Sequence, residues 1–301
     1  MADISKMFDA YNRHLSIIRE LGITDRIDDY ICPICLQGFR KEDILKLSLE
    51  DAPQEKLGGS KIAITCKHCN NTCGNTIDFH LVNYINLMER RLFLPGSDRK
   101  VGITNLGKGK PIEAALKVYN RDEMDLVIHN DYYNSESYKE RLDSIVKDTI
   151  IMVQDKPIKL NTKYVSAAII KNAYIILFSL TGYTILLHNY YNRIRNHIKD
   201  PDSFDFPKGI WKRFNYLPIE DGVYISYNKQ YLGFFIIYTI TRIQSYRYLV
   251  YLPSSSINFD KAIEKVQKLK SGDSVLLKRI DGFGFLFEKE KIELLRGLVY
   301  S

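Results

Sequence analysis

The sequence predicts an α+β protein: a small module of two strands and one helix held by cysteines, followed by a larger mixed α+β domain with an antiparallel sheet. Two observations predict this. Two Cys-x-x-Cys pairs, Cys32 with Cys35 and Cys66 with Cys69, flank a short segment with the pattern of a hairpin. The second half combines an apolar helical region at about 161–199 with aromatic and β-branched segments at about 223–287.

Composition places the chain among ordinary globular proteins. Its 301 residues are 45% hydrophobic and 26% charged, which is enough for two or three domains. The net charge of +7 moderately favours a polyanionic partner. No phosphate-binding glycine loop and no Gly-x-Ser-x-Gly elbow are found, so nucleotide hydrolysis and serine-hydrolase chemistry have no support.

The cysteines indicate a metal site. Two Cys-x-x-Cys pairs about thirty residues apart fit one tetrahedral Zn²⁺ bound by Cys32, Cys35, Cys66 and Cys69. Four of the five cysteines are used in this way, which favours a reducing compartment over disulfide bonds. Cys73 remains, and we expect it to be a small buried side chain.

The order of elements follows from periodicity and turn residues. Residues 3–21 have apolar side chains at helical spacing, followed by Gly22. Residues 47–49 and 61–65 alternate as strands on either side of Pro53 and Gly58-Gly59, and a helix begins near Asn70. The expected order is strand, strand, helix. Farther on, the pattern predicts a hairpin from 274–280 and 283–287 around Asp281-Gly282.

The stretch from Ile31 to Leu81, roughly a sixth of the chain, resembles the HNH (ββα-metal, His-Me finger) endonucleases, especially the branch with a four-cysteine zinc. The resemblance is carried by the acidic pair Glu50-Asp51, the following Ala-Pro, Gly58-Gly59, and Cys69-Asn70-Asn71 with Gly74 downstream. The resemblance implies a metal-dependent nuclease with a divalent ion at the strand end and the helix start.

The resemblance also implies residue roles. Glu50 takes the acidic position, Asp51 the position of the general-base histidine, and Asn70 the position of the helix-borne metal ligand. Lys61 stands where the family has its middle Asn. Hard oxygen ligands from Glu50, Asp51 and Asn70 suit Mg²⁺ or Mn²⁺.

Asp51 has three interpretations. It is a metal ligand beside Glu50, a weak base whose pKa its acidic neighbour raises, or part of a degenerate site in a zinc-stabilised scaffold. His80 on the predicted helix either faces the site as a catalytic residue or lies on the surface. His68 lies inside the second cysteine pair.

Basic residues beside the module are candidates for phosphate contacts. Lys61 and Lys67 lie within it, and the Gly-rich segment 95–111 carries Arg99, Lys100, Lys108 and Lys110. The same segment also fits a hairpin with a solvated tip. Both interpretations stay open at this stage.

These patterns divide the chain into an N-terminal helix (1–27), an HNH-like zinc module (28–94) and a substrate-selecting or regulatory domain (95–301). We expect a cytoplasmic protein without a signal peptide, whose longest apolar run is a buried helix. The leading hypothesis is a DNA endonuclease, with defence against foreign DNA as an association of such fusions. The alternatives are a non-catalytic protein that binds DNA or RNA and a subunit of a larger complex; a homodimer is also open.

Overall fold

The computed structural model describes residues 3–91, 94–105, 108–120, 122–128, 140, 151–155, 160–203, 206–215, 217–269, 274–282 and 284–299. The chain forms two compact units. The first comprises Met1–Val82 and Asn161–Ser301, and the second comprises Asn83–Leu160. The helices and antiparallel sheets confirm the predicted α+β class. The predicted domains 1–27, 28–94 and 95–301 are a different division of the chain, and they remain a prediction.

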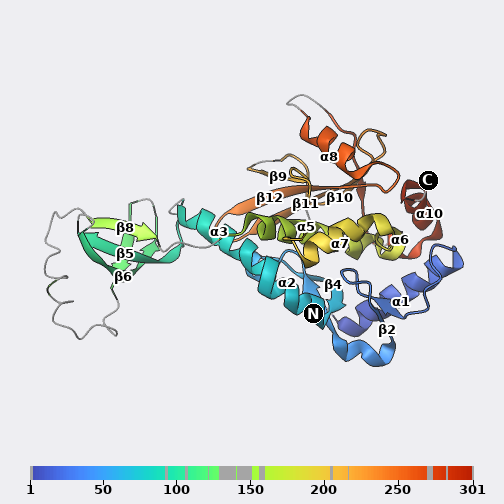
Figure 1. The fold of residues 1–301 in the computed structure, drawn as a ribbon, viewed down its shortest axis with the longest axis horizontal. Helices are drawn as coiled ribbons and strands as arrows, with labels where there is room; N and C mark the ends of the chain where they lie inside the picture. Colours follow the sequence, from blue (N-terminus) through green and yellow to red (C-terminus); the bar gives the residue numbers. More distant parts are fainter. Residues whose placement is uncertain are drawn as a thin grey trace. The chain divides into compact units, whose positions relative to one another are not determined.

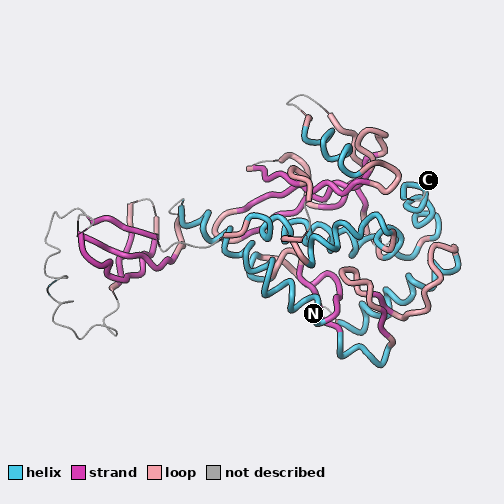
Figure 2. Tube along the Cα trace, viewed as in Figure 1, coloured by secondary structure: helices cyan, strands magenta, loops and turns pink. Residues whose placement is uncertain are grey.

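The first part of the larger unit, up to Val82, is blue to cyan in Figure 1 and is coloured by secondary structure in Figure 2. Its sequence contains both cysteine pairs. Its elements are α1 (Ile4–Glu20), β1 (Tyr30–Ile31), β2 (Gly38–Phe39), the 3₁₀ turns η1 (Lys41–Lys46) and η2 (Glu55–Leu57), β3 (Leu47–Asp51), β4 (Lys61–Cys66), α2 (Lys67–Cys73) and the π-turn η3 (Gly74–Asp78). Helix α3 (Phe79–Arg91) begins in this part, and its residues from Asn83 onward belong to the smaller unit. Strands β3 and β4 are antiparallel, with an irregularity between Glu50 and Asp51. The predicted order of strand, strand and helix is therefore present.

The second part of the larger unit is built on a buried helix and a sheet. Its elements are α5 (Thr162–Thr181), α6 (Tyr183–Leu186), η5 (Asn189–Tyr191), α7 (Asn192–Lys199), β9 (Trp211–Phe214), β10 (Gly222–Ser226), β11 (Gly233–Thr241), β12 (Ser245–Pro253), α8 (Phe259–Gln267), β13 (Lys278–Ile280), α9 (Gly284–Phe287) and α10 (Lys289–Val299). The strands form one antiparallel sheet in the order β13-β10-β11-β12-β9. Figure 1 shows the sheet between α5 and α8.

Helix α5 is the core of the larger unit because nearly all of its sides are apolar. Asn161 caps its start by accepting a hydrogen bond from the Lys163 amide, and Gly182, with φ of 57°, follows its end. Its length and composition would allow it to cross a membrane, yet 72% of its most apolar window is buried in protein. The predicted buried helix in the apolar run is thus confirmed.

Helix α1 packs against both parts of the larger unit. The Tyr11 ring stacks on Phe178 of α5 with centroids 4.6 Å apart, and Tyr11 also meets the edge of Tyr30 beside the first cysteine pair. The His14 ring nitrogen Nδ1 lies 2.7 Å from the carbonyl oxygen of Leu286 in α9. The amphipathic pattern of residues 3–21 is explained by this double contact.

One predicted hairpin is wrong. Residues 278–280 do form strand β13, but β13 pairs with β10, and residues 284–287 form helix α9 instead of a return strand. A short apolar run does not distinguish a strand from a helical turn by periodicity alone. Here Phe285 and Leu286 are buried, and Leu286 lies against α1 through His14.

The smaller unit is a four-stranded antiparallel sheet in the order β7-β6-β5-β8, from β5 (Asp98–Asn105), β6 (Lys108–Val118), β7 (Met124–Val127) and β8 (Ile151–Asp155). Its core consists of small and branched apolar side chains, Val101, Ile103, Ile112, Ala114 and Leu116. The predicted basic segment is therefore largely the β5–β6 hairpin. Arg99, Lys108 and Lys110 belong to these strands, but their side chains lie outside the described part of the structure.

The Gly-Gly turn before β4 leaves no room for a side chain. A Cβ atom at Gly59 would lie 1.6 Å from the carbonyl oxygen of Pro53. We therefore expect Gly59→Ala to lower the free energy of unfolding by about 2–4 kcal/mol, because the turn must shift. Urea denaturation would measure the loss.

Gly297→Ala in α10 is the matched control, since a Cβ there meets no atom within 4 Å. It should raise the free energy of unfolding by about 0.5–1 kcal/mol through helix propensity. If Gly59→Ala were as stable as the unmodified protein, the tight turn described here would be incorrect.

Candidate functional site

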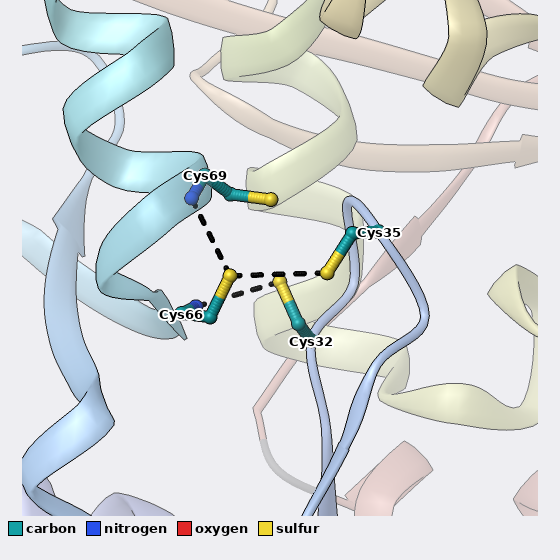
Figure 3. A group of neighbouring side chains, drawn as sticks. All are labelled: Cys32, Cys35, Cys66 and Cys69. Atoms are coloured by element: carbon teal, nitrogen blue, oxygen red, sulfur yellow. Dashed lines mark hydrogen bonds between the residues drawn. The ribbon is translucent and has the colours of Figure 1, made fainter.

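Four cysteine sulfurs come together where the loop with Cys32 and Cys35 meets the junction of β4 and α2, which carries Cys66 and Cys69. Cys32, Cys35, Cys66 and Cys69 have all their Sγ atoms within 4.8 Å of one another. Figure 3 shows the four side chains gathered beside the start of α2. The Sγ atoms of Cys35 and Cys66 are 3.8 Å apart. Four thiolates around one Zn²⁺ with Zn–S bonds of about 2.3 Å have S···S separations of roughly 3.8 Å. The predicted cysteine cluster is confirmed and can hold a zinc ion.

Local backbone structure explains why these sulfurs converge. The first pair lies in a tight loop between β1 and β2, in which the Leu36 amide donates to the Cys32 carbonyl and Leu36 has a positive φ of 60°. In the second pair, Cys66 ends β4 and also caps α2, accepting a hydrogen bond from the Cys69 amide. The remaining cysteine, Cys73, is buried outside the cluster, as expected.

A cavity of about 880 Å³ opens where β3, α2 and η3 meet. The predicted residues Glu50, Asp51 and Asn70 all line it. The other lining residues are Gln54, Glu55, Lys56, Gly74, Asn75, Asp78, Phe79 and Val82. Carboxylates outnumber cations in this lining, so the cavity favours a cationic ligand. The roles of the three predicted residues in catalysis and metal binding stay predictions.

The orientation of Asn70 is fixed by β3. Its side-chain nitrogen donates to Ser48 Oγ and to the carbonyl oxygen of Leu49, each at 2.9 Å. Because a carbonyl oxygen can only accept, the nitrogen must face the strand. The amide oxygen of Asn70 therefore remains free of these two contacts and can act as a ligand toward the cavity.

Lys171 of α5 was not predicted, and it lies at the centre of the acidic residues. Its ammonium group, 0% exposed, is 2.6 Å from Glu50 Oε1 and 2.5 Å from Asp78 Oδ2. Burial alone would lower the Lys171 pKa, but the charges of Asp78 and Glu50 outweigh it and raise the pKa well above the ordinary lysine value. Lys171 is therefore protonated at neutral pH.

Neighbouring side chains complete this buried network. Thr65 donates to Glu50 Oε2 at 2.8 Å, and the Gln54 amide donates to Asp78 Oδ1 at 2.5 Å and to Asn172 Oδ1 at 3.2 Å. One sequence signal could have revealed it. A lysine inside an otherwise apolar helix is buried only when it is paired, and Lys171 with Asn172 interrupts such a helix.

Asp51 differs from its neighbour Glu50 in its contacts. It is half-buried, and its Oδ1 atom is shielded from solvent without a hydrogen-bond partner among the described residues. Burial raises the Asp51 pKa above the ordinary value, Lys61 acts in the opposite direction, and Glu55 and Glu50 add smaller increases. The expected increase is present, but burial rather than the acidic neighbour is its main cause.

The other predicted residues are not among those that line the cavity in the described part of the chain. The His80 ring contacts the Tyr164 ring with centroids 5.0 Å apart, and its Nδ1 accepts from the Asn161 amide at 3.5 Å. Within the described residues, His80 and His68 are absent from the cavity lining. Lys61 and Lys67 are exposed in the module, and Lys100 is exposed in β5.

Compared with protein-family models, with curated proteins and with solved structures, the chain matches none of them. The resemblance to HNH endonucleases therefore depends on the residues of the ββα segment alone. What is established is a four-cysteine cluster able to bind a metal ion within an α+β protein.

We expect folding to depend on a metal ion bound by the cysteine cluster. We expect one zinc per chain by elemental analysis, and Cys66→Ala should lose both zinc and cooperative unfolding because three thiolates no longer close the site. Cys73→Ala is the matched control. It should keep the zinc and lose only about 1–2 kcal/mol of stability from a small cavity. Zinc retained in Cys66→Ala would contradict the four-cysteine site.

The Lys171 network predicts a pH-dependent loss of stability. Lys171→Met leaves Glu50 and Asp78 buried without their cation, which should cost about 3–5 kcal/mol at pH 7. Burial already raises the Asp78 pKa, and the charge of Lys171 opposes this increase, so the Asp78 pKa would rise further above its unfolded value in the variant. The variant should therefore regain stability as the pH falls from 7 to 5, where a carboxylate takes up a proton.

Urea denaturation at both pH values would measure this difference. Lys261→Met on α8 is the control, since Lys261 is exposed and should change the stability by less than about 0.5 kcal/mol. An equal loss at both pH values would show that the unpaired carboxylates are not the source.

Proposed function

We propose that this chain is a zinc-stabilised HNH-type endonuclease that hydrolyses phosphodiester bonds in DNA with a divalent cation. The observation that supports this most directly is the acidic cavity lined by Glu50, Asp51 and Asn70 at the junction of β3 and α2. A nuclease of this type needs hard oxygen atoms at a strand end opposite a helix start. The cysteine cluster holds the start of α2, which carries Asn70, to the loop between β1 and β2.

A divalent ion would be held by Asp51 and Asn70, with Glu50 beside them. The buried Oδ1 atom of Asp51 without a partner in the described residues fits such a ligand, as does the amide oxygen that Asn70 keeps free of β3. When bound, Mg²⁺ or Mn²⁺ would stabilise negative charge on the phosphate and the leaving oxygen.

The residues of the chain have separate tasks in this proposal. If Asp51 is the base instead of a ligand of the ion, it accepts a proton from the attacking water, which its raised pKa favours; the Asp51→His variant below distinguishes these two tasks. Lys171 and Thr65 hold the Glu50 carboxylate in one orientation. Exposed Lys61 and Lys67, on the module itself, contact the phosphate backbone.

A second candidate function is a non-catalytic nucleic-acid-binding or complex-forming protein. The Lys171 ion pairs favour it, because the ammonium group already engages one oxygen of Glu50 and one of Asp78, which leaves fewer carboxylate oxygens for a metal ion. No imidazole lines the cavity in the described part of the chain. The two candidates differ in whether purified protein cuts DNA.

A nicking assay on supercoiled plasmid in Mg²⁺ or Mn²⁺ tests the proposal. Asn70→Ala should lower the nicking rate at least about 100-fold by removing a ligand, while zinc content stays unchanged and unfolding stays cooperative, with a loss of about 1–3 kcal/mol from the two hydrogen bonds to β3. Asn71→Ala, one residue along the same helix and exposed, is the matched control and should cut at the original rate. Equal cutting by Asn70→Ala would assign the activity to a contaminant.

Asp51→His tests the base position directly. An imidazole has a pKa near neutral pH, so the substitution should raise the nicking rate roughly tenfold or more at pH 7 if Asp51 is the base. A lower rate would instead assign Asp51 as a metal ligand. The pH profile should also move toward the histidine pKa.

A further inference from the structure

A second cavity, of about 320 Å³, lies in the larger unit away from the cysteine cluster, at the start of α5. It is formed by three segments: the first turns of α5, the end of α7 with the loop that follows, and the start of β9. Its lining includes Lys163, Ser166, His197, Phe206, Lys208 and Trp211. Its size is that of a site for one small molecule.

His197 gives this cavity an unsatisfied polar group. The side chain is only 3% exposed, and neither ring nitrogen has a hydrogen-bond partner among the described residues. Buried polar atoms are normally paired, so this imidazole requires an explanation. Burial, and then the charge of Lys163, lower the His197 pKa to about 4. The ring is therefore neutral at physiological pH and offers one donor and one acceptor.

The aromatic walls are held in place by specific contacts. Phe206 stacks on His197 with centroids 4.3 Å apart, and its ring also meets Phe259 at 5.7 Å. The Trp211 indole donates to Ser166 Oγ at 2.9 Å. The loop between them is tied to α8 by a hydrogen bond from the Gln267 amide to the Lys208 carbonyl oxygen. These contacts hold the planar rings of Phe206 and Trp211 in fixed positions on the cavity wall.

The charge of the lining identifies the class of ligand. Lys163 and Lys208 are its ionised side chains, and no carboxylate is found among the described residues that line it. Two cations suit a phosphate dianion, and the first turn of the 20-residue helix α5 adds to the positive potential. The first cavity, lined by carboxylates, has the opposite character.

We propose that this cavity binds a nucleoside 5′-monophosphate, with the phosphate at Lys163 and Lys208 and the base against Phe206 and Trp211. The imidazole of His197 donates to or accepts from the base or the sugar hydroxyls. The nucleotide is either free or the 5′-phosphorylated end of a strand, since both present the same groups. This site is independent of the divalent-cation site proposed above.

Trp211 provides the measurement, because it is the only tryptophan in the chain. Each nucleoside 5′-monophosphate is titrated into the full-length protein, with calorimetry as a second readout. At least one should change the Trp211 emission saturably. The matching nucleoside and inorganic phosphate should each bind at least about tenfold more weakly, since each lacks half of the contacts.

The variants separate this site from general attraction of anions. Replacing both lysines (Lys163→Gln with Lys208→Gln) should weaken binding at least about tenfold, whereas the exposed neighbour Lys212→Gln should leave it within about twofold. His197→Leu should weaken binding without lowering the melting temperature, because it removes two unpartnered atoms at similar volume. Asn70→Ala should bind normally, which distinguishes this test from the nicking assay.

Comparing a mononucleotide with a 5′-phosphorylated tetranucleotide distinguishes the two sources. Tighter binding of the tetranucleotide assigns the ligand as a strand end, and equal or weaker binding assigns it as a free nucleotide. The proposal is overturned if no nucleotide binds saturably, if inorganic phosphate binds as tightly as the nucleotides, or if the double lysine variant binds as tightly as the unmodified protein.

Discussion

The larger unit depends on one buried ion pair network, in which Lys171 of α5 contacts Glu50 of β3 and Asp78 of η3. Removing these charges from water costs several kcal/mol for each ion, and only close pairing offsets that cost. The network therefore fixes one relative position of α5 and the cysteine module. A sliding or rotation of α5 would leave at least one charge buried and unpaired.

The same network gives the acidic cavity its shape. Glu50 is held by Lys171 and Thr65, and Gln54 connects Asp78 to Asn172 of α5. Asn70 is held separately, by the end of β3. Residues on strand, turn and helix are thus oriented by contacts that do not involve a ligand. The cavity belongs to the whole unit rather than to the cysteine module alone.

Much of the module could be predicted from local sequence. The cysteine spacing predicted the four-cysteine cluster, and the alternation around Pro53 and Gly58-Gly59 predicted two strands before a helix. Both patterns depend on residues that are close together along the chain. Lys171 could not be placed in this way, since its partner Asp78 is 93 residues away in the chain and Glu50 is farther still. Helix α9 was missed for a similar reason: its apolar residues are explained by contact with α1.

The insertion of Asn83–Leu160 within the larger unit has a consequence for biosynthesis. A ribosome completes the cysteine module before it has made α5, so Asp78 is released some 93 residues ahead of its cation. Until Lys171 is made, the carboxylates of Glu50 and Asp78 must stay hydrated and cannot be buried. The smaller sheet (β5 to β8) lies between Asp78 and α5 in the chain, so it is available to fold before the network forms. Translation order therefore places the closing of this ion-pair network after the smaller unit has been made. The strands β9 to β13, which follow α5 in the chain, complete the larger unit later still.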